Sequence, residues 1–411
     1  MVDLKAIYLT ALERCAPAEV VGRFPVSEYP FPVVAIGKCA VAMAAAVGPR
    51  EAFVAVPEGY GDGALDGNDR TYRTDRTNRT DRTAAGQIIR GGHPQMTAAS
   101  FAAGKALLDF VDRHDDLLFL ISGGGSACVE VALAPFTEGE VADVNRRLLD
   151  AGLPIREINT VRKRLSAIKG GKLAARVRGR AVTLLYSDVS DGALGDVASG
   201  PTLPDDTTVD EAIAILRRIE CDHIVTKLRD GTPPPVVPPA EVHLLADNGT
   251  LTAAAAKLVE EAGGVAVRWE GQLEGDVGEA AARLAERVRT LRRGEVLIAG
   301  GEPTVVKRGD GRGGRCSELA LRFALKLQDE TDNGPRNTDN VSALFGSSDG
   351  VDGNSGAAGI LFPTLPAVNK AEIEGALAAS NSFPIAAQVG EPIMIAPTGN
   401  NLRDLFLMAR G

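Results

Sequence analysis

The sequence predicts an α/β protein built from two layered domains. Short, wholly apolar segments alternate with alanine-rich segments of helical periodicity along most of the 411 residues. Strands that are apolar on both faces are typical of largely parallel sheets covered by helices on both sides. Domains usually hold about 100–200 residues, so this length fits two of them. We expect two layered α/β domains, each with helices on both faces of its sheet.

The expected elements follow one another in the order that such a fold requires. Continuous apolar runs predict strands, and alanine-rich stretches predict helices. The predicted strands lie at 31–36, 53–56, 117–121, 182–186, 296–299 and 342–345, and helices are predicted at 38–47 and 98–111.

The clearest domain boundary is a proline-rich segment at 231–240. It contains five prolines in ten residues, GTPPPVVPPA. Proline continues neither a helix nor a central strand, so the segment reads as a linker or an extended crossover. The predicted domains are residues 1–235 and 236–411.

An unusual repeat interrupts the first domain. The pair Arg-Thr recurs five times between Arg70 and Thr83. The segment offers almost no apolar surface to bury, so we expect a surface loop. A basic arm that binds an anion is the alternative.

Composition excludes several classes of protein. The chain has 45 basic and 54 acidic residues, a net charge of −9, whereas nucleic-acid binding usually needs a basic face. It lacks an apolar run of about 18–20 residues and the layout of a signal peptide, so no membrane association is expected. Five scattered cysteines argue against disulfides or a zinc site. We therefore expect a cytoplasmic protein that binds small molecules, and the sequence leaves a homodimer open.

The first candidate ligand loop follows the strand at 117–121. Its glycines allow a ligand to approach the backbone closely, and successive N–H groups in such a turn bind anions. The loop residues are Ser122, Gly123, Gly124, Gly125 and Ser126. Lys38 lies at a similar strand-to-helix junction, where a cation opposes the helix dipole and so indicates an anionic partner. A tight turn and a surface lysine are the plain alternatives.

A basic segment, Asn159–Lys172, is the second candidate. Arg162, Ser166 and Lys169 have the i, i+4, i+7 spacing of one helix face, which suits a phosphate or a carboxylate. A solvated basic helix fits the charges equally well.

Acidic turns follow two further strands. Asp188 and Asp191 lie beyond the strand at 182–186, and Asp349 lies beyond the strand at 342–345. Carboxylates in such places suit Mg²⁺ or a general base. Aspartate, serine and glycine are also common turn formers, so plain turns are the alternative.

The last candidate is the glycine-rich segment that ends at Arg315. Gly309, Gly311 and Gly314 formally match G-x-G-x-x-G, but the acidic residue expected about 20 positions on is not at the end of a strand. Arg315 at the start of a helix suits an anionic ligand better than a neutral ribose. No P-loop, protein-kinase signature or complete nucleophile elbow is present in the sequence.

Taken in this order, the motifs resemble those of the class II glycerate 2-kinases, a two-domain family whose C-terminal part is called MOFRL. The resemblance spans nearly the whole chain, and the segments that carry it are 35–39, 92–94, 121–127, 158–172, 187–189, 198–202, 300–302, 311–315, 348–353 and 397–399.

The resemblance implies a Rossmann-like N-terminal domain with a largely parallel sheet, a smaller C-terminal MOFRL-type α/β domain, and an active site in the cleft between them. It also implies phosphorylation of D-glycerate at its 2-hydroxyl, with ATP and Mg²⁺, giving 2-phosphoglycerate and ADP. It maps the family's catalytic lysine and arginine onto Lys38 and Arg315. With the motifs above, we expect Asp188 to be catalytic too. The expected nucleotide-binding residues are Ser122, Gly123, Gly124, Gly125, Ser126, Gly311, Gly313 and Gly314, the substrate-binding residues are Asn159, Arg162 and Lys169, and the metal ligands are Asp188, Asp191 and Asp349.

The chain departs from the family pattern in its C-terminal half. The family usually has Arg-Asn-Gln-Glu where this chain has Arg315-Cys-Ser-Glu318, Asn-Asp-Ser at 380–382, and Gly-Pro-Thr-Gly-Thr-Asn at 396–401. Two other functions stay open: a reductase of hydroxypyruvate that uses NAD(P)H, and a non-catalytic sensor of a sugar acid or a nucleotide.

Overall fold

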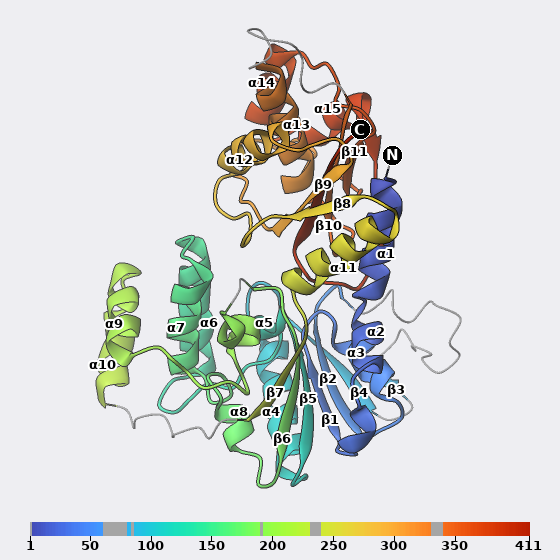
Figure 1. Cartoon of the computed structure of the whole chain (residues 1–411). Helices are drawn as coiled ribbons and strands as arrows, with labels where there is room; N and C mark the ends of the chain where they lie inside the picture. The colour runs from blue at the N-terminus through green and yellow to red at the C-terminus, as the bar shows by residue number, and fades with distance from the viewer. Residues whose placement is uncertain (1, 61–79, 84–85, 190–191, 231–239, 330–339) are drawn as a thin grey trace. The chain divides into compact units, whose positions relative to one another are not determined.

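The computed structural model describes residues 2–60, 80–83, 86–189, 192–230, 240–329 and 340–411, and it confirms the α/β class (Figure 1). These residues divide into two compact units, residues 17–245 and residues 1–16 with 246–411. The predicted ranges, 1–235 and 236–411, differ in two ways: they assign the N-terminal helix to the first part and residues 236–245 to the second. The proline-rich segment, up to residue 239, lies outside the described residues.

The unit of residues 17–245 contains one sheet with its helices. Its strands are β1 (Val33–Ile36), β2 (Ala52–Pro57), β3 (Thr80–Thr83), β4 (Gly86–Gly91), β5 (Leu117–Ser122), β6 (Ala181–Tyr186) and β7 (Glu241–Ala246). Its helices are α2 (Pro17–Gly22), α3 (Ala40–Val47), α4 (Ala98–Asp112), α5 (Gly125–Cys128), α6 (Glu138–Asp150), α7 (Ile155–Leu165), α8 (Lys172–Ala175), α9 (Val209–Arg218) and α10 (Asp222–Asp230), with 3₁₀ turns η1 (Val26–Glu28) and η3 (Leu194–Ser199). The strands and helices predicted for this half are confirmed to within a few residues.

The seven strands have the order β3-β4-β2-β1-β5-β6-β7. The pairs β4–β2, β2–β1, β1–β5 and β5–β6 are parallel. From β1 the chain passes outward to β2 and β4, and it then returns to β5 on the other side of β1. The strand order therefore reverses between β1 and β5. In open parallel sheets, the loops at the carboxyl ends of such a strand pair form the ligand crevice.

Alternation along the strands explains how both faces of this sheet are covered. Val34 and Ile36 of β1 share a hydrophobic cluster with Leu107 and Phe110 of α4. Val33 and Ala35, which alternate with them along β1, point to the opposite face. On that face α3 contacts β1, β2 and β5.

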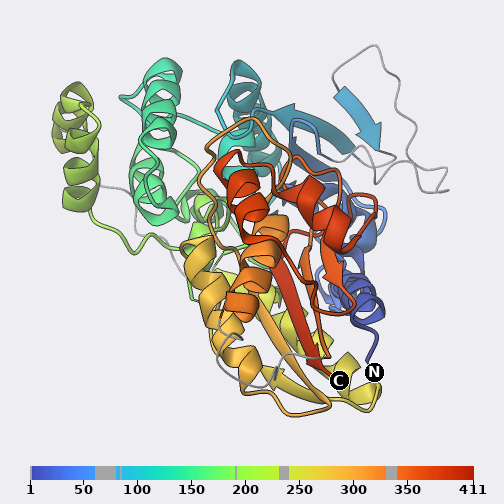
Figure 2. The same cartoon turned by 90° about the horizontal axis from the view of Figure 1, so that it is seen from above.

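Helices α6, α7, α9 and α10 form a separate group in this unit, and both views show them side by side (Figures 1 and 2). They share one hydrophobic cluster, which extends to Phe101 of α4 and Ala127 of α5. Its members in the four helices include Val141, Leu148, Val161, Leu216 and Ile224. Capping boxes at the first residues of α6 and α9 define where these helices begin.

The loop predicted for the Arg-Thr repeat is wrong for its last four residues. Thr80–Thr83 form β3, which pairs antiparallel with β4 at the edge of the sheet. Without β3, strand β4 would be the edge strand, with unpaired backbone N–H and C=O groups. Such a strand can pair with another strand through backbone hydrogen bonds alone, so the repeat needs no apolar side chains to form β3. The rest of the repeat, residues 70–79, lies outside the described residues.

The second unit also has one sheet. Its strands are β8 (Val265–Arg268), β9 (Glu295–Gly301), β10 (Val341–Ser347), β11 (Gly359–Phe362), β12 (Glu391–Pro392) and β13 (Asp404–Arg410). Its helices are α1 (Leu4–Arg14), α11 (Asn248–Glu261), α12 (Val277–Arg289), α13 (Arg315–Asp329), α14 (Lys370–Ala378) and α15 (Ser382–Val389).

The direction of the strands in this second sheet differs from the expectation. The order is β12-β11-β10-β13-β9-β8. Only the β8–β9 pair is parallel among the described strands of this unit, and the other pairs are antiparallel. The central strands are nevertheless buried along almost their whole length, because helices cover both faces. Burial on both faces makes a strand apolar whatever its direction, so hydrophobicity alone did not distinguish a parallel from an antiparallel sheet.

Helix α1 belongs to this unit because its buried face packs on α11, β10 and β13. The hydroxyl of Tyr8 in α1 also donates a hydrogen bond to the carbonyl of Ser347 at the end of β10, at 2.6 Å. Among the described residues, no helix combines the length and the apolar character that a membrane span requires.

Candidate functional site

The predicted lysine and the predicted glycine loop lie together at the point where the strand order reverses. The backbone N–H of Lys38 donates to the carbonyl of Gly123 at 2.9 Å, and the N–H of Cys39 donates to Ser122 Oγ at 3.1 Å. A Cβ at Gly37 would lie 2.3 Å from the carbonyl oxygen of Ser122, and its φ is +117°. Only glycine tolerates this conformation at so close an approach.

The predicted Asp188 reaches the same loop from the end of β6. A Cβ on Gly123 would lie 1.7 Å from Asp188 Oδ2, and a Cβ on Gly124 would lie 2.9 Å from Lys38 Cγ. The two candidate catalytic side chains therefore lie against adjacent glycines of one loop. Asp191 lies outside the described residues.

Two aromatic side chains, neither of which was among the predicted site residues, lie beside Lys38 at the carboxyl ends of these strands. Tyr60 follows β2, and His93 follows β4. Lys38 Nζ lies 5.1 Å from the centroid of the Tyr60 ring, and the rings of Tyr60 and His93 meet edge to face at 6.2 Å. Desolvation lowers the pKa of His93, and the positive charges of Lys38 and Arg162 lower it further. Three basic side chains thus act on one region beside the glycine loop.

Two of the three residues predicted to hold the substrate, Asn159 and Arg162, are buried in α7. Arg162 Nε donates to Asn145 Oδ1 at 2.8 Å, and burial lowers the pKa of Arg162 to about 10. Asn159 Nδ2 donates to the carbonyl and to Oδ1 of Asp196, both at 3.2 Å. Both side chains are therefore fixed by protein partners before any ligand binds.

The helical spacing predicted for Arg162, Ser166 and Lys169 is wrong beyond Leu165. Helix α7 ends there, and Ser166 has extended backbone angles. Ser166 Oγ donates to Glu130 at 2.6 Å, and Lys169 Nζ pairs with the same carboxylate at 2.5 Å. Glu130 is 0% exposed and Lys169 is 1% exposed. The predicted contact of Lys169 with substrate stays a prediction, and its geometry favours an internal role.

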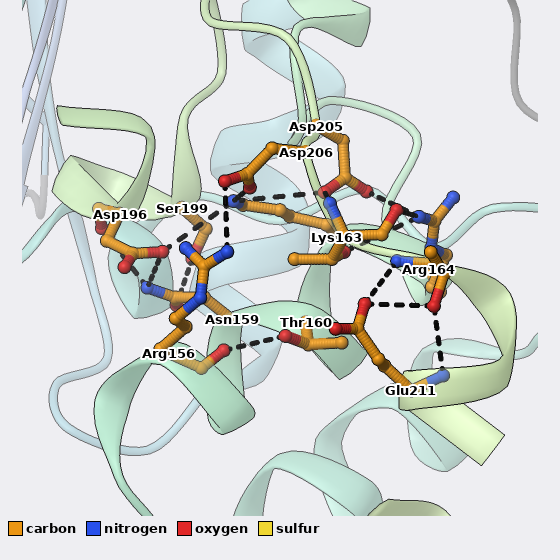
Figure 3. A network of polar contacts seen from close by, with 12 residues as sticks. Arg156, Asn159, Thr160, Lys163, Arg164, Asp196, Ser199, Asp205, Asp206 and Glu211 are labelled. Carbon is orange, nitrogen blue, oxygen red and sulfur yellow. Dashed lines mark hydrogen bonds and ion pairs between the residues drawn. The ribbon is translucent and has the colours of Figure 1, made fainter. Parts of the chain in front are cut away.

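Other cations of the basic segment are also neutralised within this unit (Figure 3). Lys163 Nζ lies 3.6 Å from Asp196, 3.9 Å from Asp205 and 3.8 Å from Asp206. Arg164 pairs with Asp205 at 3.2 Å. Lys163 and Arg164 of the basic segment are therefore the buried cations of an ion-pair network. The acidic residues that complete this network lie more than thirty positions downstream in the sequence.

In the second unit, the predicted Arg315 lies among acidic side chains where the central strand β13 begins. Arg315 Nε and Nη2 donate to the two oxygens of Asp404 at 2.6 and 2.8 Å, and Nη1 lies 3.2 Å from Glu302. Nη2 also donates to Ser347 Oγ at 3.3 Å. Burial raises the pKa of Asp404 to about 6, although Arg315 opposes the shift. The register explains the gathering, since Asp404 is paired with Ser347 on one side and with Gly301 on the other.

Two more carboxylates lie in the turn after β10. Asp349 Oδ1 accepts hydrogen bonds from Ser347 Oγ at 2.7 Å and from the N–H of Val351 at 2.9 Å. Asp352 accepts the N–H groups of Cys316 and Ser317 at 2.8 and 3.0 Å. Asp352 thereby caps the start of α13, directly after Arg315.

The glycine-rich loop before α13 uses its backbone donors inside this unit. The N–H groups of Gly311, Gly313 and Gly314 donate to Ala379 O, Asn354 Oδ1 and Ser317 Oγ at 3.2, 2.8 and 3.0 Å. A nucleotide phosphate would have to displace these partners. The geometry therefore favours a structural role for the three glycines, and their predicted contact with nucleotide stays a prediction.

The predicted metal ligands do not form a ready-made cage. Within the described part of the chain, no group of three or more His, Cys, Asp or Glu side chains is arranged to hold a metal ion. Magnesium in phosphoryl-transfer sites is usually held by one or two carboxylates together with substrate phosphates. Single oxygen donors such as Asp188 or Asp349 are compatible with that chemistry.

Comparison with known proteins identifies the family. A family model described as a domain of unknown function, DUF4147, matches residues 3–230, and the MOFRL family model matches residues 295–404. A glycerate 2-kinase of Sulfurisphaera tokodaii is 32% identical over 337 residues, which cover 78% of this chain and 79% of that protein. The chain belongs to the glycerate kinase family with a C-terminal MOFRL domain.

Two further relatives of this glycerate kinase family member bear on its fold and function. The crystal structure of glycerate kinase from Thermotoga maritima superposes with a TM-score of 0.81, at 28% identity, over 99% of this chain and 98% of that one. A protein of Agrobacterium vitis, named as a putative hydroxypyruvate reductase, is 33% identical over 341 residues, covering 78% of this chain and 76% of that protein.

Proposed function

We propose that this chain transfers the γ-phosphoryl group of ATP to the 2-hydroxyl of D-glycerate and releases 2-phosphoglycerate and ADP. The observation that carries the proposal is the position of Lys38. Its side chain lies against a glycine loop at the reversal of strand order. Asp188, which follows β6, lies against the same loop, and His93 is near enough for the charges of Lys38 and Arg162 to act on it. Membership of the glycerate kinase family supports the choice of substrates.

Phosphoryl transfer asks the protein mainly for positioning and for neutralisation of charge. We assign the neutralisation to Lys38 and Arg315. The guanidinium of Arg315 is a permanent cation, and Asp404 holds it in one orientation. A guanidinium fixed in this way pays little reorganisation when negative charge develops on the transferred group. Both residues should therefore affect kcat more than KM.

Asp188 is the candidate base and magnesium ligand of the first unit. The carboxylate lies against Gly123, so a substrate hydroxyl bound over the loop would be within its reach. Mg²⁺ in a kinase site neutralises charge on the nucleotide phosphates. In this unit Asp188 would hold it, and Asp191 and Asp349 are the further ligands that the sequence predicts. The Ser122–Ser126 loop would hold phosphate oxygens through its N–H groups.

The carboxylate of D-glycerate needs a cationic partner. Arg162 is the best candidate, because its Nε donates to a neutral acceptor, Asn145 Oδ1, and because its charge reaches His93 beside the glycine loop. Asn159 and Lys169 are predicted to assist. Since both have close protein partners, we propose that they act by fixing α7 and the loop after it.

The proposal is tested by following ADP release from ATP and Mg²⁺ with and without D-glycerate. We expect ADP release that depends on D-glycerate and is absent from a Lys38→Ala variant. ADP release of equal rate without D-glycerate would mean that this chain hydrolyses ATP or uses another acceptor, and the proposal would fail.

A reductase of hydroxypyruvate is the second candidate, because a relative carries that name. The formal G-x-G-x-x-G match gives it little support. That fingerprint requires a strand, a glycine turn and a helix within a parallel unit. Here β13 separates β9 from β10 and pairs antiparallel with both. Oxidation of NADH by hydroxypyruvate would establish the reductase, and binding of ligand without either reaction would indicate a sensor.

A further inference from the structure

A chain of hydrogen bonds links Ser126 of the glycine loop through Ser199 and Asn159 to Asp196. The acceptors in this chain determine which group is the donor at each step. Asn159 Nδ2 faces two acceptors of Asp196, its carbonyl and its Oδ1, so the amide nitrogen must be on that side. Asn159 Oδ1 therefore faces Ser199, and Ser199 Oγ donates its proton to it at 2.8 Å. Figure 3 shows Ser199, Asn159 and Asp196 in this order.

The next link reaches the glycine loop itself. Ser126 Oγ lies 2.8 Å from Ser199 Oγ. A hydroxyl group has one proton, and that of Ser199 is already given to Asn159. Ser126 must therefore be the donor in this pair. The proton of Ser126 points into the protein, and only lone pairs of Ser126 Oγ remain for a ligand.

The segment that presents Ser199 is strained. Ala198 and Ser199 have φ values of 50° and 60°, both in the left-handed region that residues other than glycine rarely adopt. Hydrogen bonds from Gly170 and Gly171 hold the strained turn, to the carbonyls of Ser199 and Gly200 at 3.1 and 2.7 Å. Such strain persists only where surrounding structure imposes it, and it gathers at functional sites.

The inner end of the chain is anchored in the ion-pair network. Asp196, which receives the amide of Asn159, also lies 3.6 Å from the ammonium group of Lys163. Lys163 is 1% exposed, and Ser199 is 0% exposed. Ser126, by contrast, is half-buried. Every member except the last is thus inaccessible to a ligand, so the network can act on a ligand only through Ser126.

We propose that Ser199 is a positioning residue that holds the Ser126 hydroxyl as a hydrogen-bond acceptor, so that this end of the glycine loop binds a hydroxyl group of a ligand and not a phosphate oxygen. A phosphate oxygen at neutral pH accepts hydrogen bonds and would meet only lone pairs here. This assignment deepens the proposed function, on which it rests for the identity of the ligands, and it revises the expected contact of Ser126 with phosphate.

The hydroxyl can come from the sugar acid or from the ribose of the nucleotide. The two sources are separated by ligand pairs that differ in one hydroxyl. D-lactate is D-glycerate without the 3-hydroxyl, 3-hydroxypropionate is glycerate without the 2-hydroxyl, and 2′-deoxy-ATP and 3′-deoxy-ATP each lack one ribose hydroxyl. Binding of each ligand to the full chain is measured by titration calorimetry, without turnover. Ser126→Ala should weaken one hydroxyl-bearing ligand about two- to tenfold, the worth of one neutral hydrogen bond, and leave its partner unchanged.

A double-mutant cycle then tests whether Ser199 acts through Ser126. We expect Ser199→Ala to weaken the same ligand in the wild-type background and to have no further effect when Ser126 is already alanine. Ser199→Gly is the matched control, since it removes the same hydroxyl but relieves the left-handed strain. It should match Ser199→Ala in ligand binding and exceed it in Tm.

Three results would overturn the proposal. The first is an effect of Ser199→Ala that is equally large in the Ser126→Ala background, and the second is normal binding in Ser199→Gly. The third is an equal loss for both members of every ligand pair. Because the cycle reads binding alone, a wild-type chain that binds these ligands but transfers no phosphoryl group would refute the proposed function without deciding the role of Ser199.

Discussion

Arg315 and Asp404 form a bidentate ion pair, with Nε–Oδ2 and Nη2–Oδ1 distances of 2.6 and 2.8 Å. Arg315 is the first residue of α13, and Asp404 is the first residue of β13. Asp404 is fully buried, so the pair fixes the position of the first residue of α13 relative to the first residue of β13. A fork held at two points has one orientation left, and its Nη1 is directed toward the partly exposed Glu302.

The pair predicts an acid limb in the pH profile of the reaction. Since the pKa of Asp404 is about 6, lowering the pH through 6 protonates this carboxylate. Protonation breaks one of the two hydrogen bonds that Asp404 accepts from the guanidinium of Arg315. We expect kcat to fall over this range. In Asp404→Asn the limb attributable to this group should disappear, with kcat low at every pH. An unchanged limb in the variant would assign it to another residue.

The same carboxyl should affect stability in the opposite direction. Its folded pKa is raised above the ordinary value of 3.8, so the folded state binds its proton more tightly than the unfolded state does. The stabilisation from this proton is fully present below about pH 4 and is lost as the pH rises through about 6. The test is the change of Tm with pH in the wild type relative to Asp404→Asn.

Lys38 is predicted to act mainly in the transition state. Lys38→Ala should lower kcat on the order of a thousandfold, as loss of a charge-stabilising cation does in other phosphoryl transfers, with little change in KM. Lys105→Ala is the matched control, because Lys105 is an exposed lysine whose ion pair with Glu138 lies on the surface. A near-normal kcat for Lys38→Ala would contradict the assignment.

The close approach of Asp188 to Gly123 predicts a steric effect. Gly123→Ala would place a methyl group 1.7 Å from Asp188 Oδ2, so the carboxylate must move away from the loop. We expect a loss of activity similar to that of Asp188→Ala. Gly139→Ala in α6 is the control, because nothing lies within 4 Å of its added Cβ and alanine favours a helix. Full activity in Gly123→Ala would mean that the carboxylate has no required position there.

The buried pair of Lys169 and Glu130 predicts a stability effect that separates two roles. Lys169→Met leaves Glu130 unpaired in the interior and should destabilise the fold by about 3–5 kcal/mol. Adding Glu130→Leu should recover much of this loss, measured by denaturant unfolding. If Lys169 is purely internal, activity returns with stability. A stable double variant with strongly raised KM for D-glycerate would instead support the predicted substrate contact.

The sequence was most informative where hydrophobic runs and glycine turns are local. The strands at 33–36, 117–122 and 181–186 are short apolar runs, and the residues after them carry the candidate site. Lys38, the Ser122–Ser126 loop and Asp188 were predicted separately. The parallel sheet brings them together, because it places the carboxyl ends of its strands at one edge.

Partners that lie far apart along the chain were missed for a physical reason. Glu130 and Lys169 are 39 residues apart, and Arg315 and Asp404 are 89 residues apart. Charge counts within a segment reveal the cation but not its distant counter-ion. The basic run around Lys163 therefore predicted either a surface for an anion or a solvated helix, whereas the ammonium group of Lys163 lies close to three aspartates inside the unit. Strand direction in the second sheet was missed because burial on both faces conceals it.

The most direct measurement of the central claim is an assay that identifies the product by position. The wild-type chain is incubated with D-glycerate, ATP and Mg²⁺, and enolase is added to consume 2-phosphoglycerate specifically. We predict signal without phosphoglycerate mutase, and none from Lys38→Ala. Signal that appears only when mutase is added would show that 3-phosphoglycerate is formed, and it would contradict phosphorylation of the 2-hydroxyl.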